Sequence, residues 1–315
     1  MRLFGIVLVL AICVSCEKST LPDEPPKPDP VLALDLPQVT AGYDRFDSAP
    51  LTLTAGETAI VVDGTSIVPL RDGAVDPSEL EGGAYGIKIR RLTAFIKNAV
   101  VALKADRAAV LFDRDYPYKL LVSVLFSMKA DNTGLRRFDF VAKANGALVS
   151  IPIILPDRAR AGVAGGRRTP GSDLGAQIEE VRIGRGSGTP SGGNEPVEDL
   201  RPQPHPDDMP LGLFVSITKD RMIVWSITGL EGTLRDPRHV YKPDATGMTK
   251  LTADLTSIVE RRWGGRPRPP DTTSIVIQAD GATTVQTVAE VFGAVRKDAK
   301  GRDLFPDIQL AMGFE

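Results

Sequence analysis

Cysteine is almost absent from this chain, and its two cysteines, Cys13 and Cys16, both lie near the N-terminus. The rest of the chain therefore has no thiol that could form a disulfide, bind zinc or attack a substrate. Histidine is equally scarce: His205 and His239 lie beside prolines or in expected loops, and we interpret them as solvated. There is also no nucleophile elbow, Walker loop or paired-histidine zinc motif. These absences predict a protein that is not an enzyme and binds no cofactor or metal.

A strong charge of either sign is also missing, because the formal net charge is only -2. Such a balance gives no basic footprint for nucleic acid. The one basic run, residues 261–268, is interrupted by Trp263, by glycines and by Pro267. We interpret this run as a solvated loop and exclude nucleic acid as a partner.

No apolar run is long enough for a transmembrane helix, which needs roughly 20 residues. The longest lies at residues 3–12, after Arg2 and shortly before Ser15 and Cys16. This order of charged, apolar and small residues is typical of a secretory signal. Residues 14–16 resemble a bacterial lipobox, in which the cysteine is acylated and becomes the first mature residue, although Cys13 replaces the usual leucine. We therefore predict lipid attachment at Cys16, with plain secretion as the alternative.

Two segments are expected to be tethers, one between the signal, residues 1–16, and the first folded part of the chain, and one between the two folded parts. Residues 17–30 are rich in proline and should be extended. Residues 156–210 are rich in Gly, Pro, Ser and charge, which predicts a disordered linker. Glu17 stands where aspartate is typical of inner-membrane retention. Its presence favours the outer membrane, with the protein facing the periplasm.

Asp113 and Asp280 each close a short apolar strand and precede an amphipathic helix, at an offset of 167 residues. Before each Asp the apolar residues alternate, and eight residues after it a stripe with helical spacing begins. The same change of period at one constant offset predicts a duplicated strand-turn-helix unit. We interpret both Asp side chains as turn or capping residues without a chemical role.

The duplication divides the chain into two tandem domains, 31–155 and 211–315, each large enough to bury a core. The linker between them predicts that they move independently. In the first domain we expect a hairpin over 51–62, then a long polar loop that follows it and passes through residues 72–73 and 82–83, helices over 89–103 and after Pro117, and strands at 108–112, 137–142 and 148–155. Asp115 is the expected cap of the second helix.

The second domain is expected to repeat most of these strands and helices in the same order. The patterns predict strands at 213–217, 222–227, 274–279 and 308–312, and helices around 251–259 and 284–297. This copy ends one strand early. Its last strand would therefore leave an open sheet edge unless another segment covers it.

The run from Asp113 to Leu125, together with residues 34–37 and the hairpin, resembles the periplasmic domain of the ExbD/TolR biopolymer-transport family. The second copy is similar through residues 275–280 and 285–288, so the resemblance covers most of both domains but not the tethers. It implies an α+β fold in which each copy has a small mixed sheet and two helices. It also implies a possible homodimer.

Members of this family use a transmembrane helix with an acidic residue beside an ExbB/TolQ channel subunit. Residues 3–14 contain no Asp or Glu, so the resemblance is confined to the periplasmic part. It implies a non-catalytic cell-envelope lipoprotein that acts as a binding or scaffold module, accessory to an ExbB/TolQ-type ion-driven transport or motility machine. The alternative is a peptidoglycan-binding anchor. Tyr118 and Trp263 are candidates for stacking on a sugar, although a tyrosine that begins a helix more often packs at its edge.

Overall fold

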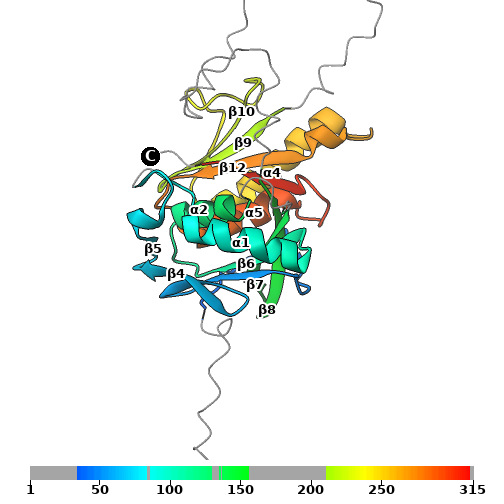
Figure 1. The fold of residues 1–315 in the computed structure, drawn as a ribbon. Helices are drawn as coiled ribbons and strands as arrows, with labels where there is room; N and C mark the ends of the chain where they lie inside the picture. The colour runs from blue at the N-terminus through cyan, green and yellow to red at the C-terminus, as the bar shows by residue number, and fades with distance from the viewer. Residues whose placement is uncertain (1–33, 84–85, 130–134, 136, 156–210, 313–315) are drawn as a thin grey trace, which may run out of the picture.

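The computed structural model describes residues 34–83, 86–129, 135, 137–155 and 211–312, and it shows an α+β fold (Figure 1). Cys16, His205 and the two predicted tethers lie outside the described residues. We call the described parts of 31–155 and 211–315 the first half and the second half. Together they contain four α-helices and a mixed sheet of thirteen strands.

Each half contains two α-helices, as predicted. The elements of the first half are β1 (Asp44–Arg45), β2 (Thr52–Ala55), β3 (Ala59–Val62), β4 (Thr65–Arg71), β5 (Ala74–Val75), a 3-10 turn (Pro77–Glu79), α1 (Arg90–Leu103), β6 (Arg107–Phe112), α2 (Tyr118–Met128), β7 (Arg137–Ala144) and β8 (Ala147–Ile154). The elements of the second half are β9 (Leu213–Ile217), β10 (Met222–Ser226), β11 (His239–Tyr241), α4 (Ala245–Trp263), a 3-10 turn (Pro270–Thr272), β12 (Ser274–Ala279), α5 (Val285–Arg296) and β13 (Asp307–Leu310).

The two halves repeat one topology. In the first half, β2 pairs antiparallel with β3 and parallel with β6, and β6 pairs parallel with β7. In the second half, β9 pairs antiparallel with β10 and parallel with β12, and β12 pairs parallel with β13. In both halves a helix follows the central strand, β6 or β12, as the repeated pattern at Asp113 and Asp280 predicts.

The strands of the two halves do not form two separate sheets. Strand β8 pairs antiparallel with β7 and parallel with β13, so one path of neighbouring strands runs from β11 through β8 to β5. The expected open edge at β13 is therefore covered by β8, a strand of the first half. This shared strand explains how the second half can lack an equivalent of β8.

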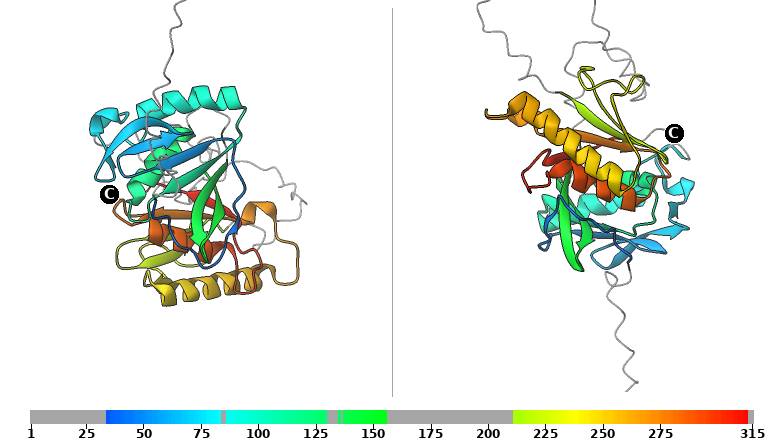
Figure 2. Two further views of the ribbon diagram at one scale, coloured as in Figure 1. Left: turned by 90° about the horizontal axis from the view of Figure 1, so that it is seen from below. Right: turned by 180° about the vertical axis from the view of Figure 1, so that it is seen from behind.

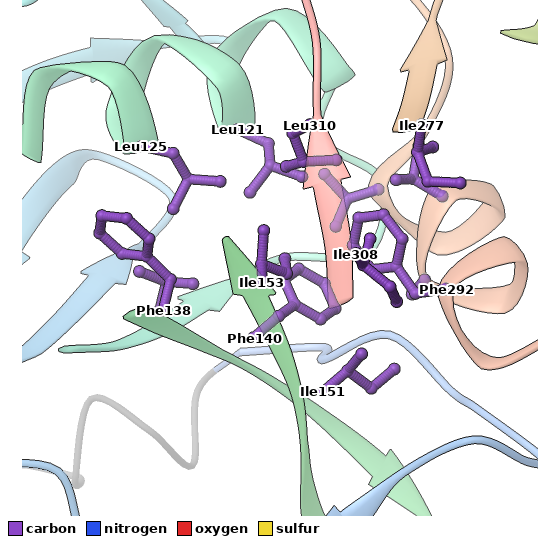
Figure 3. Close-up of a cluster of buried hydrophobic side chains, with 14 of the residues drawn as sticks. Leu121, Leu125, Phe138, Phe140, Ile151, Ile153, Ile277, Phe292, Ile308 and Leu310 are labelled. Carbon is purple, nitrogen blue, oxygen red and sulfur yellow. The ribbon is translucent and has the colours of Figure 1, made fainter. Parts of the chain in front are cut away.

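The hydrophobic core also crosses the junction between the halves. Helices of both halves pack on one face of the twisted sheet, and the strands of the two halves flank the helices in Figure 1. The rings of Phe140 on β7 and Phe292 on α5 meet edge to face, with centroids 5.5 Å apart. Figure 3 shows both rings among buried side chains of β8 and β13, including Ile153 and Ile308. A common core and a common sheet contradict the expectation that the halves move independently.

Two local expectations are wrong. Part of the expected polar loop contains β4, whose Val68 and Leu70 are buried, because Asp63 and Gly64 adopt positive φ and turn the chain into a second hairpin. Asp115 does not cap α2, since Pro117 occupies the N-cap position and Asp115 lies in the preceding turn. In the second half the cap is Thr284, whose side chain accepts from the backbone N–H of Thr287.

Candidate functional site

An N-terminal strap, residues 38–44, ties the first half to helix α5 of the second. The backbone N–H of Gln38 donates to Oε1 of Gln286 at 2.8 Å, and Nε2 of Gln286 donates to the Gln38 carbonyl at 2.9 Å. At the other end, Arg296 donates to the carbonyl of Gly42 and forms an ion pair with Asp44 at 2.5 Å. The strap is thus held at both ends by side chains of one helix.

Asp44 is partly exposed, and its ion pairs are correspondingly weakened by solvent. Burial acts to raise the pKa of Asp44, but hydrogen bonds and charges from Arg296 and Lys297 outweigh it, so the pKa is lowered. The lowered pKa means that the ionised carboxylate is the form that holds the strap.

Two glycines allow the strap to cross α5 closely. Gly42 has φ +69°, and a Cβ atom there would lie 2.1 Å from the carbonyl oxygen of Gly293. A Cβ atom on Gly293 would lie 2.6 Å from the carbonyl oxygen of Ala41. Both contacts are with backbone atoms, so side-chain rotation alone cannot relieve them. The crossing therefore requires glycine on both segments.

The turns before α2 and α5 meet in a nearly twofold arrangement. Pro117 and Thr284 form an isolated antiparallel bridge, and these residues are separated by the same 167 positions as Asp113 and Asp280. The backbone bonds around this bridge come in reciprocal pairs: Tyr118 N–H to Thr283 O and Val285 N–H to Tyr116 O, then Lys119 N–H to Gly281 O and Gln286 N–H to Arg114 O. Equivalent residues exchange donor and acceptor roles, as across the interface of a symmetric dimer.

A groove of about 680 Å³ lies where the strap, α4 and α5 meet. Figure 2 (right) shows α4 and α5 side by side, and Thr252 on α4 donates to the Ala294 carbonyl on α5 at 2.9 Å. The groove is lined by residues of four segments. The strap contributes Gln38, Thr40 and Ala41, and α4 contributes Ala245, Met248, Thr249, Thr252, Ala253, Thr256 and Glu260. Helix α5 contributes Glu290 and Ala294, and the segment after it contributes Lys297, Asp298, Ala299, Lys300 and Arg302. Both halves contribute to it, so the groove depends on their association.

The threonines of α4 make the groove less polar than its sequence suggests. Thr249 donates to the carbonyl of Ala245, Thr252 to those of Met248 and Ala294, and Thr256 to that of Thr252. Hydroxyls that already donate to backbone carbonyls leave the methyl groups as the free part of these side chains. Methyl groups of threonine and alanine, with the flexible Met248, thus form much of the wall.

Charged side chains gather at the rim of the groove, near the C-terminal end of α4. Arg302 contacts Glu260 at 2.9 Å and Asp298 at 2.6 Å, and Lys297 contacts Asp44 at 3.3 Å. Because most of these charges are paired with one another, they favour no strongly charged ligand. The groove is suited to apolar side chains bordered by polar ones.

Residues singled out from the sequence occupy other places. The side chain of Asp113 accepts from the backbone N–H of Asp115, which is the predicted turn role, whereas Asp280 closes a turn through its backbone carbonyl. Tyr118 and Trp263 are only 1% and 4% exposed, which excludes either ring from stacking on a sugar. Cys16, the predicted lipid attachment site, lies outside the described residues.

His239 is not the solvated side chain expected from the sequence. Its Nε2 atom lies 3.3 Å from Glu231 and its Nδ1 atom lies 3.5 Å from Asp254. Glu231 also pairs with Arg261 at 2.5 Å, and Asp254 accepts from the Tyr241 hydroxyl at 2.6 Å. Burial, with the hydrogen bond and charge of Asp254, raises the pKa of Tyr241. Sequence reasoning missed this network because it also missed β11, which has only three residues.

Within the described ranges, no three His, Cys, Asp or Glu side chains are arranged to hold a metal ion. In the same ranges, no helix combines the length and apolar character needed to cross a membrane. Comparison of the chain with protein-family models, curated proteins and solved structures finds no match.

Proposed function

We propose that this chain is a non-catalytic lipoprotein of the cell envelope that binds a polypeptide partner in the groove between the strap, α4 and α5. The observation that carries the proposal is the composition of that groove, a wall of methyl groups with paired charges at its rim. Such a wall favours aliphatic side chains of a partner, which gain free energy when they leave water. The partner we propose is a subunit of an ExbB/TolQ-type ion-driven transport or motility machine.

The duplicated topology supports a relationship to the ExbD/TolR periplasmic domain. Under this proposal, 31–155 and 211–315 are two copies of one domain that have become joined in a single chain. The reciprocal bonds around Pro117 and Thr284 resemble the contacts of a homodimer interface within one molecule. A partner that would contact two subunits of a homodimer would contact a single chain in this protein. It would bind in one groove to which both halves of that chain contribute.

Peptidoglycan binding is the second candidate, and the groove favours it less. Sugar hydroxyls that lose water against methyl groups would lack hydrogen-bond partners, at a cost of about 1–3 kcal/mol for each buried group. None of the groove residues is aromatic, and Tyr118 and Trp263 are buried. If peptidoglycan is nevertheless the partner, the protein will sediment with purified sacculi.

Blocking the groove tests the polypeptide proposal. Ala253 is an exposed residue of the groove wall, and Ala253→Trp should fill part of the groove without disturbing the core. We expect the variant to lose at least about tenfold in recovery of an ExbB/TolQ-like subunit from detergent extracts, since one side chain in a central pocket has effects of this size. The matched control is Val101→Trp on α1, where the native side chain is 73% exposed. Equal recovery with both variants would exclude the groove as the binding site.

Attachment of a lipid at Cys16 is tested separately. Cells that grow with a fatty-acid analogue should label the wild-type protein, and Cys16→Ala should remove the label because the variant has no acceptor thiol. Several acyl chains give durable anchoring, whereas one alone is marginal. The variant should therefore also leave the membrane fraction. Unchanged labelling in Cys16→Ala would show that the lipid prediction is wrong, while the groove proposal would remain open.

A further inference from the structure

The network around His239 joins three segments that are separate in the sequence. Glu231 lies in the connection between β10 and β11, His239 begins β11, and Asp254 lies in the middle of α4. Among the strands that the structure describes, β11 pairs with β10 alone and lies at the edge of the sheet. Contacts between its side chains and α4 therefore fix this edge of the sheet against the helix.

The two ring nitrogens of His239 both face carboxylates. A neutral imidazole has one N–H and one lone pair, whereas the protonated ring has two N–H groups. With a neutral ring, one nitrogen lone pair would face a carboxylate oxygen at 3.3 or 3.5 Å and be repelled by it. Only the protonated ring attracts Glu231 and Asp254 at the same time.

Other charged groups around the ring do not remove this preference. Arg261 of α4 pairs with the Oε1 atom of Glu231, and the Oε2 atom of that carboxylate faces His239. The Tyr241 hydroxyl is neutral and donates to Asp254. With a neutral ring the four side chains Glu231, Asp254, Arg261 and Tyr241 carry a net charge of one negative unit, which protonation of His239 cancels. Glu231 is 4% exposed, whereas the side chain of Asp254 is 47% exposed, so water screens the contact of His239 with Asp254 more than its contact with Glu231.

We propose that Glu231, His239 and Asp254 form a pH-responsive clamp that fastens the β10–β11 edge to α4 when the imidazole is protonated. Histidine is the side chain whose charge ordinarily changes within the physiological pH range. The clamp and the groove share one helix, because Thr252, Ala253 and Thr256 beside Asp254 line the groove. A change in the clamp therefore acts on the segment that forms the groove wall, although the clamp itself does not depend on any ligand.

The test compares the protein at about pH 8 and about pH 5.5, where ordinary Asp and Glu side chains remain mostly ionised. Hydrogen exchange of the amides of β11 and α4 reports how often this edge opens. When the pH is lowered from about 8 to about 5.5, we expect the opening constant of the wild type to fall by about three- to tenfold more than that of His239→Gln. An effect of this size is typical of a partly exposed ion pair. Asp254→Asn keeps an acceptor for Tyr241 but removes the charge, and should show a reduced pH effect.

Two further measurements make the result decisive. His205→Gln changes the only other histidine and should keep the full pH effect. Carbon-13 NMR of the wild-type ring reports its charge directly and needs no variant to fold. A ring that stays neutral at about pH 5.5, or an equal pH dependence in wild type and His239→Gln, would overturn the proposal. Neither result bears on whether a polypeptide binds in the groove.

Discussion

Gly42→Ala is expected to lower the free energy of unfolding by about 3 kcal/mol, a large effect for a single methyl group. The new Cβ atom would lie 2.1 Å from the Gly293 carbonyl oxygen, and φ at this position is +69°. The chain must therefore bear a left-handed conformation and also move the strap away from α5. Urea unfolding followed by circular dichroism measures the loss.

A matched glycine separates these two costs. Gly64 has φ +80° and nothing within 4 Å of the position of its Cβ atom, so Gly64→Ala tests the backbone strain alone. It should cost about 1 kcal/mol. If the two variants lose the same stability, the close crossing of strap and helix contributes nothing. Equal losses would also mean that the close crossing does not hold the strap in its place as a wall of the groove.

Phe292→Ala is expected to have a still larger effect, about 4 kcal/mol, because it empties a fully buried site. The ring lies on α5, but its edge-to-face partner Phe140 lies on β7 of the other half. Since the core is continuous, we expect amides of both halves to lose protection from hydrogen exchange together, in one unfolding transition.

The control for this variant is Val101→Ala, which removes apolar atoms from a side chain that is 73% exposed and should change stability by less than about 0.5 kcal/mol. Two separate transitions in Phe292→Ala, with only the second half destabilised, would contradict a shared core. In that case the halves would behave as the independent domains expected from the sequence.

The elements with strong local patterns could be predicted from the sequence. The apolar stripe of α1 gave its bounds to within one residue, since Leu92, Ile96 and Val100 point into the core as the helical period requires. The duplicated pattern at Asp113 and Asp280 likewise located β6, β12 and the helices that follow them. Strand β4 was missed, although Asp63-Gly64 is a common hairpin signal.

Features that depend on contacts between distant residues could not be predicted in this way. The pairing of β8 with β13 joins strands from opposite halves, and no local pattern specifies such a register. The groove requires that residues 38–41 lie against α5, which follows from the Gly42 and Gly293 crossing but not from either glycine alone. Similarly, His239 acquires its role only when Glu231 and Asp254 meet it in space.

The position of β8 also determines when the sheet around it can be completed during translation. Strand β8 emerges from the ribosome early, but β13, which pairs with it, emerges near the C-terminus after residues 155–306 have been made. Until then the outer edge of β8 lacks that partner, and an exposed strand edge promotes aggregation. Strand β1 covers this edge only at Val149 and Ser150, so translation that stops shortly before Asp307 would yield a chain in which the edge at Ile153 and Ile154 stays open. Such a product should depend on chaperones or be degraded.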